Sequence, residues 1–156
     1  MTKVRAGREG CNISFGSPIR MIDDLTPISD LVANIDGPIL FFNVGASCVL
    51  GDAYGPLIGS LLRDANLGYD NVAIMGTMED FIGSTVIAER IDQAKVRYRD
   101  HTVIAIDAAV GSVLGRITLE EGMLVAGAGV NRSLPPIGDY AITAVTLVMD
   151  YDPKLT

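Results

Sequence analysis

Leu40-Phe41-Phe42-Asn43-Val44-Gly45 and Val103-Ile104-Ala105-Ile106-Asp107-Ala108 are apolar runs of the kind found in strands that are buried on both faces of a sheet. The first run leads directly into Gly51-Asp52-Ala53-Tyr54-Gly55-Pro56-Leu57, and the second contains Asp107. Each predicted strand therefore delivers an aspartate at or just past its end. In an open α/β sheet, ligands bind in the crevice beyond the carboxyl ends of the strands. The sequence therefore predicts that Asp52 and Asp107 meet in one site.

Helical patterns alternate with the apolar runs along the chain. Helices are predicted to begin at Thr26-Pro27, with Thr26 as the N-cap, at Pro56, with Leu57, Leu61, Leu62 and Ala65 facing inward, and over Ser84–Tyr98. Strands are predicted at Ile39–Val44, Val72–Met75, Thr102–Ile106, Gly115–Leu119 and Ile142–Val148. This alternation predicts an α/β fold with a mostly parallel sheet covered by helices on both faces. We expect the first three strands to be adjacent and parallel.

Composition narrows the class of protein. The 156 residues fit one domain, and a hydrophobic content of 49% with only 20% charged residues argues against disorder. The net charge of −7 is a poor match for nucleic acid. No apolar run approaches the roughly 18 residues of a membrane helix, and no apolar segment of a signal peptide follows the N-terminal basic residues. We therefore expect a cytoplasmic protein that binds neither nucleic acid nor membrane.

We divide the chain into an N-terminal arm and first helix, residues 1–37, and an α/β region, residues 38–156, within one globular domain. The two cysteines, Cys11 and Cys48, are expected to be reduced thiols, and no residue cluster predicts a metal site or a cofactor. A hydrophobic chain with few charges and no helix after its last strand is expected to self-associate, most simply as a dimer.

A pair of carboxylates is a recognisable chemical device. When two lie within a few ångströms of each other, one pKa rises and the pair can share a proton. The charged member can then activate water while the protonated member donates to a carbonyl oxygen. Gly51 and Gly55, which flank Asp52, would let the backbone approach a substrate closely. The competing interpretation is structural, because an aspartate in a loop is more often a turn former or a helix cap.

Other polar residues are assigned structural roles. Glu79 and Asp80 are expected to begin a helix and to stabilise its dipole. His101 precedes a strand, so it is expected at the edge of the sheet opposite the aspartates. The glycines of Gly127-Ala128-Gly129 lack the strand and helix on either side that a dinucleotide-binding motif requires.

Four groups of residues resemble, in order and spacing, the YyaC-like sporulation protein family. They are Phe42–Gly59, Gly76-Thr77, Ala105-Ile106-Asp107-Ala108 with Gly111, and the segment from Gly127 to Asp139 with Ile142-Thr143. The resemblance covers about Pro38 to Val148. It implies a three-layer α/β/α fold of the phosphorylase/hydrolase-like type, related to the spore germination protease and more distantly to the hydrogenase maturation proteases.

The resemblance also implies roles for individual residues. The two aspartates of the germination protease, an atypical aspartic peptidase, fall on Asp52 and Asp107. Substrate-binding positions would be Gly51, Gly55, Gly76, Thr77 and Asp139.

This chain departs from the family pattern at two positions that matter for chemistry. Ala46-Ser47-Cys48 stands where the family carries a Thr-Asp-Arg-like stretch, and Phe81-Ile82-Gly83 stands where it often carries a histidine. The first departure removes a carboxylate and a cation that could bind substrate. The missing histidine counts against a nickel site like that of the hydrogenase maturation proteases.

Two functions therefore remain open. One is a peptidase-like hydrolase acting on a protein or peptide, with water activated by Asp52 and Asp107. The other is a non-catalytic binding or assembly module that keeps the protease-like fold. The separation of the two carboxylates is the observation that bears most directly on the choice.

Overall fold

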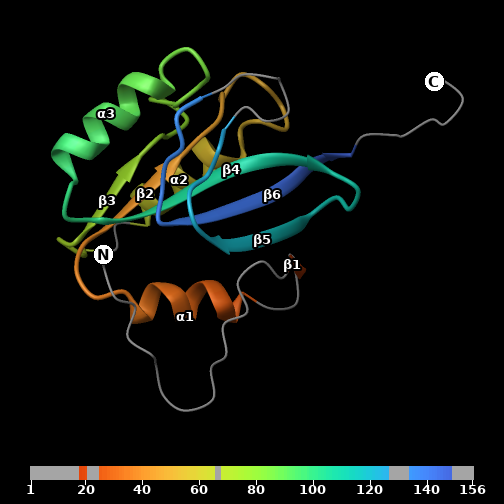
Figure 1. Cartoon of the computed structure of the whole chain (residues 1–156). Helices are drawn as coiled ribbons and strands as arrows, with labels where there is room; N and C mark the ends of the chain where they lie inside the picture. The colour runs from red at the N-terminus through yellow and green to blue at the C-terminus, as the bar shows by residue number, and fades with distance from the viewer. Residues whose placement is uncertain (1–17, 21–24, 66–67, 127–133, 149–156) are drawn as a thin grey trace, which may run out of the picture.

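The computed structural model describes residues 18–20, 25–65, 68–126 and 134–148 (Figure 1). In chain order the elements are β1 (Pro18–Arg20), α1 (Thr26–Asn34), β2 (Ile39–Asn43), α2 (Tyr54–Asp64), β3 (Val72–Met75), α3 (Ile87–Arg97), β4 (Thr102–Gly111), β5 (Arg116–Glu121) and β6 (Tyr140–Val148). Among these residues, no helix has the length and apolar content needed to cross a bilayer.

The strands form one sheet of six, in the order β1-β5-β6-β4-β2-β3. The three neighbouring pairs β2/β3, β2/β4 and β4/β6 are parallel, whereas β5 pairs antiparallel with β6 and with β1. The prediction that the first three core strands are adjacent and parallel is confirmed. Because β2, β3 and β4 run in one direction, their carboxyl ends lie at the same edge of the sheet.

Helices cover both faces of the sheet, as Figure 1 shows for α1 and α3. Alternate residues of a strand point to opposite faces, and β2 follows this rule. Leu40 and Phe42 pack in one buried cluster with Ile87 and Ile91 of α3. Ile39 and Phe41 pack in a second cluster, which contains Leu31 of α1 and is flanked by α2 side chains. The predicted α/β fold is confirmed, and its layers are helix, sheet and helix.

Several elements differ from the sequence-based expectations: α2, α3, β5 and β6 by one to three residues at an end, and others by more. Strand β4 continues to Gly111 rather than ending at Ile106, because β6 stays paired with it through this extension. Thr26 is the first residue of helix α1 and not its N-cap. The N-cap is Leu25, which makes no side-chain hydrogen bond to the helix. Residues 18–20, expected in an irregular arm, form the edge strand β1. Glu79 and Asp80 lie in the loop before α3 and do not begin a helix.

Helix α2 is turned differently from its predicted orientation. Leu57 and Leu61 are about half exposed, so the expectation that they face inward is wrong. The buried side of the helix is formed instead by Gly55, Pro56, Gly59 and Ser60. A Cβ atom at Gly59 would lie 1.9 Å from the carbonyl oxygen of Gly76, at the end of β3. The small residues therefore let the helix backbone touch the carboxyl ends of the strands, a contact that no larger side chain permits.

Candidate functional site

Asp107 lies in β4 at the level where β2 stops. Asn43, the last residue of β2, pairs with Ile106, and the N–H of Val44 donates to the carbonyl oxygen of Ile106 at 2.7 Å. Asp107 is the next residue of β4, and on its other side it pairs with Thr143 of β6. It therefore lies within a strand, but at the carboxyl end of the neighbouring strand β2, as the topology of an α/β site requires.

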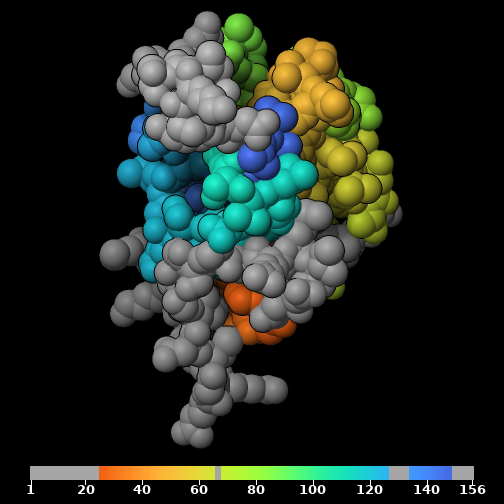
Figure 2. All heavy atoms as spheres, turned by 90° about the vertical axis from the view of Figure 1, so that its right-hand side faces the viewer, coloured from red at the N-terminus to blue at the C-terminus, as the bar shows by residue number. Residues whose placement is uncertain are grey.

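Asp52 is placed by the loop that joins β2 to α2. Its Oδ2 accepts a hydrogen bond of 2.8 Å from the N–H of Ala46, which closes the loop. The carbonyl oxygen of the preceding residue, Gly51, accepts a hydrogen bond from the hydroxyl of Thr146. The loop is thus tied both to its own start and to β6. Figure 2 shows the loop, the turn after β4 and the end of β6 on one face of the molecule.

The two carboxylates form one electrostatic site. The pKa of Asp107 is raised from its ordinary value of 3.8 to about 7, mainly by burial and to a lesser extent by the nearby charge of Asp52. A hydrogen bond of 2.8 Å from the N–H of Ala108 to Oδ1 of Asp107 opposes the rise, because it stabilises the ionised form. Burial is therefore the main cause, and the like charge that sequence reasoning emphasised is a lesser one.

Asp52 and Asp107 are not joined directly. Within the described part of the chain, neither carboxylate donates to or accepts from the other, and each uses one oxygen for a backbone N–H. The remaining oxygen of each group has no protein partner among these residues. Two carboxylates, each with one uncommitted oxygen, can act on a water molecule or on a carbonyl group that lies between them.

The predicted binding glycines lie at this edge of the sheet, but they have structural roles. A Cβ atom at Gly55 would lie 2.1 Å from the carbonyl oxygen of Val44. The absence of a side chain at Gly55 therefore lets α2 pack against the backbone of Val44. A Cβ atom at Gly51 would lie 3.0 Å from the side chain of Leu147. Gly51 and Gly55 therefore hold the loop and α2 around Asp52, and the expected approach of a substrate to their backbone stays a prediction.

Gly76 and Thr77 follow β3, two strands away from β4 in the sheet. This separation corresponds to about 10 Å between strand axes. The backbone N–H of Thr77 donates to the carbonyl oxygen of Asp80, and its hydroxyl accepts from the N–H of Asp80, each at 3.1 Å. Thr77 is therefore engaged in a local turn beside the site.

Asn43 is a polar residue of this edge that sequence reasoning did not select. It is fully buried, and its Nδ2 donates to the carbonyl oxygen of Met75 at 2.8 Å. Its Oδ1 is buried without a partner among the described residues. The sequence could have pointed to Asn43, because a polar amide inside an apolar run is buried with the strand and must find hydrogen-bond partners there. Asn43 joins the ends of β2 and β3 and so fixes the edge on which the site is built.

Asp139 lies at the other edge of the sheet. Its Oδ2 accepts from the N–H of Val103 at 2.8 Å, and its own N–H donates to the carbonyl oxygen of the same residue. Val103 precedes Asp107 by four residues, a distance of about 13 Å along β4. The structure therefore does not bring Asp139 to the two aspartates. Its fixed role is to pair the start of β6 with the start of β4.

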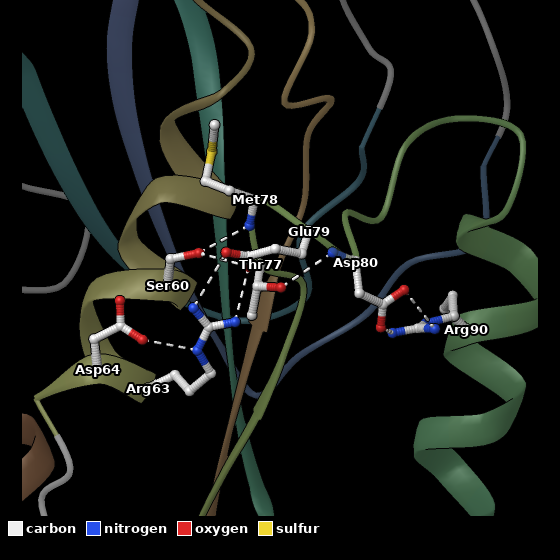
Figure 3. Close-up of polar contacts among 8 residues, drawn as sticks. All are labelled: Ser60, Arg63, Asp64, Thr77, Met78, Glu79, Asp80 and Arg90. Carbon is white, nitrogen blue, oxygen red and sulfur yellow. Dashed lines mark hydrogen bonds and ion pairs between the residues drawn. The ribbon is translucent and has the colours of Figure 1, made fainter.

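Ion pairs brace the loop after β3 against two helices (Figure 3). Arg63 of α2 contacts Glu79 at 2.8 Å, and Asp80 contacts Arg90 of α3 at 2.6 Å. The hydrogen bond from Arg63 is the main cause that lowers the pKa of Glu79 to about 2. Ser60 of α2 also accepts a hydrogen bond from the N–H of Met78. These contacts hold the end of β3 next to α2 and explain why Glu79 and Asp80 are not in a helix.

The remaining candidate ligands are dispersed. His101 lies at the amino end of β4, where its ring packs edge-on against Tyr98 at 5.0 Å. Cys48 is an exposed free thiol in the loop before α2. In the regions covered by the structure, no three His, Cys, Asp or Glu side chains gather in a way that could hold a metal ion. The Gly127-Ala128-Gly129 segment and Cys11 lie outside the described residues.

Comparisons with known proteins agree with the motif resemblance. Residues 20–152 match the family described as "Protein of unknown function (DUF1256)". The "Uncharacterized protein YyaC" of Bacillus subtilis (strain 168) is 30% identical over 116 residues, which is 73% of this chain and 56% of that relative. The chain thus spans little more than half the length of its relative. Since the family match extends over most of the described fold, the chain belongs to the DUF1256 family, and it is similar to YyaC.

Proposed function

We propose that this protein is a peptidase-like hydrolase in which Asp52 and Asp107 activate water for the cleavage of a peptide bond. The observation that carries the proposal is the environment of Asp107. Its pKa, raised to about 7 mainly by burial, leaves a substantial fraction protonated near neutral pH, next to the charge of Asp52. A strongly perturbed carboxyl group beside a second carboxylate is typical of an acid and base pair.

The proposed roles follow from the two protonation states. Asp52 accepts a proton from water as the water oxygen attacks the carbonyl carbon, and Asp107 donates its proton to the carbonyl oxygen. The tetrahedral intermediate then collapses with cleavage of the C–N bond. Asp52 returns its proton to the leaving nitrogen, and Asp107 recovers a proton from the hydroxyl group of the intermediate. The hydrogen bonds from Ala46 and Ala108 keep both carboxyl groups in place through these steps.

The resemblance to the spore germination protease adds support, because its catalytic aspartates fall on the same two positions. The same resemblance supports a role in sporulation, and with it a cytoplasmic protein or peptide substrate.

Cleavage of a fluorogenic peptide library tests this function. We expect the wild-type protein to cleave at least one library sequence, and Asp52→Asn or Asp107→Asn to lower the rate by about 10²-fold or more. Both substitutions keep an oxygen that can accept the backbone N–H, so thermal unfolding should not reveal a loss of fold. Asp139→Asn is the matched control, since it removes a carboxylate at the opposite edge and should leave the rate unchanged. Full activity in the Asp52→Asn, Asp107→Asn double variant would exclude this mechanism.

A binding or assembly module is the second candidate, and one observation favours it. The loop before α2 exposes two apolar side chains, Val49 at 52% and Leu50 at 96%, directly after the stretch Ala46-Ser47-Cys48 that replaces the charges of the family pattern. Such a loop is suited to contact with another protein. If the wild-type protein binds peptides or proteins through this loop, and Leu50→Ser abolishes that binding while no library peptide is cleaved, the module is the better description.

A further inference from the structure

Strand β4 has an open edge directly after Asp107. Residues Thr102 to Ile106 pair with β2 on one side, but β2 ends at Asn43 and the last five residues of β4 pair only with β6. The side of β4 that faces β2 is therefore without a neighbouring strand from Asp107 to Gly111, within the described part of the chain. Unpaired strand edges are templates for the addition of another strand.

The direction of each backbone group follows from printed contacts at both sides of β4. The carbonyl oxygen of Ile106 accepts from Val44, so even-numbered residues direct their backbone groups toward β2. The carbonyl oxygen of Val103 accepts from Asp139, so odd-numbered residues direct theirs toward β6. The register with β6 shifts between Ala109 and Val110, where the extra residue, Thr146, lies on β6. The alternation along β4 therefore continues, and Ala108 and Val110 face the open edge.

Three of the four backbone groups on this edge are available. The N–H of Ala108 is used by Oδ1 of Asp107. By this alternation, the carbonyl oxygen of Ala108 and both backbone groups of Val110 point away from β6, and no described residue in a turn or loop bonds to them. Val110 is 50% exposed and Ala108 is partly buried, so this edge of β4 reaches the protein surface. They present an acceptor, a donor and an acceptor, spaced as a strand requires.

The surroundings of the edge limit what can bind there. Val110 pairs with Leu147, whose side chain fills the space beside Gly51 that a Cβ atom would need. The Val110 and Leu147 side chains are both about half exposed. The charged residues in the segments 44–58 and 105–115 are Asp52 and Asp107 alone. Apolar side chains would be buried favourably against this surface, whereas an acidic ligand would meet like charge.

We propose that Ala108 and Val110 bind an extended peptide segment as an added strand, and that this segment carries apolar side chains and no carboxylates. This mode of recognition uses main-chain hydrogen bonds for affinity and alternate side chains for selectivity. The proposal rests on the peptidase function for its purpose, because a peptide on this edge would pass beside Asp107. It names the substrate class as extended, apolar and non-acidic.

Fluorescence anisotropy on the full chain carrying Asp107→Asn tests binding without turnover. The probes are three fluorescein-labelled, lysine-ended octapeptides in which threonine alternates with valine, leucine or phenylalanine. We expect saturable binding of at least one probe. We also expect at least tenfold weaker binding when alternate peptide nitrogens are methylated, and when glutamate replaces threonine.

Val110→Pro is the decisive variant. It removes the N–H that faces the open edge, while the pairing with β6 uses the backbone groups of Ala109 and Gly111, and proline is tolerated at such edge positions. We expect Val110→Pro to weaken binding at least tenfold and Val110→Ala, the matched control with an intact N–H, to weaken it less than threefold. If Val110→Pro does not fold, the methylated peptides carry the test.

The outcomes separate this proposal from the proposed function. Peptide binding that is sensitive to Val110→Pro, without cleavage by the wild type, supports the edge and contradicts the peptidase. Cleavage with the same KM in Val110→Pro and wild type supports the peptidase and overturns the edge. Absence of binding by every probe, equal binding of methylated peptides, or a Val110→Pro effect only on self-association would also overturn the edge.

Discussion

At the scale of single residues, the chemistry of this site depends on where Asp107 is buried. The sequence predicts that Asp52 and Asp107 lie at one edge, because each follows a strongly apolar run. It does not predict that burial outweighs the charge of Asp52 in raising the pKa of Asp107, since burial of a strand end depends on the loop that covers it. Nor does it predict the place of Asp139, because the start of a strand and a site loop look alike in composition.

The raised pKa of Asp107 predicts a pH dependence of stability. The folded protein retains this proton up to about pH 7, whereas the unfolded chain releases it near 3.8. The free energy of unfolding should therefore fall as pH rises between these values, by at most about 1.4 kcal/mol per pH unit for one proton, and then level off. Asp107→Asn removes the part of this pH dependence that comes from the Asp107 carboxyl group.

Urea unfolding from pH 4 to 8 measures the effect. The stability of Asp107→Asn relative to wild type should increase with pH up to about pH 7 and stay constant above it. A difference between the two proteins that is independent of pH would contradict the raised pKa.

At the scale of elements, helix α2 shows why periodicity alone misplaced side chains. Leu57 and Leu61 have the spacing of an inward face, yet the glycines of the opposite face permit a backbone contact that leucines cannot make. Strands β2 and β3 were predicted within one residue, because a short continuous apolar run is typical of a strand with helices on both faces of its sheet. The extension of β4 was missed because Ala108 to Gly111 carries little apolar pattern, and its strand structure depends on the partner β6.

Gly59→Ala tests the close packing of α2. In an exposed helix this change stabilises by up to about 1 kcal/mol. Here the new methyl group would overlap the carbonyl oxygen of Gly76, so we expect a net destabilisation of about 2 kcal/mol or more. Thermal unfolding measures it, with Leu57→Ala as a control in the same helix that should cost much less. Equal or higher stability of Gly59→Ala would show that α2 is not packed in this way.

At the scale of the whole molecule, the outer surface of α2 predicts self-association. Leu57 and Leu61 lie one turn apart and are 48% and 57% exposed, so they form an adjacent apolar pair that self-association would bury. We expect a dimer of twice the 16.5 kDa chain mass, formed through this face.

Sedimentation velocity at micromolar concentration tests the dimer. Leu61→Lys should give the monomer, whereas Val96→Lys, a matched change at an exposed position of α3, should leave the dimer intact. A wild-type protein that sediments only as the 16.5 kDa species would contradict the expectation.

The site also depends on the whole molecule, since β2, β4 and the loop before α2 together bring two distant aspartates into one electrostatic site. Titration of the Asp107 carboxyl carbon by NMR tests this arrangement most directly, and it needs no substrate. We predict a pKa of about 7 in the wild type and a lower value in Asp52→Asn that stays above the ordinary 3.8, because burial remains. An ordinary pKa for Asp107 in the wild type, or one that Asp52→Asn leaves unchanged, would contradict the account.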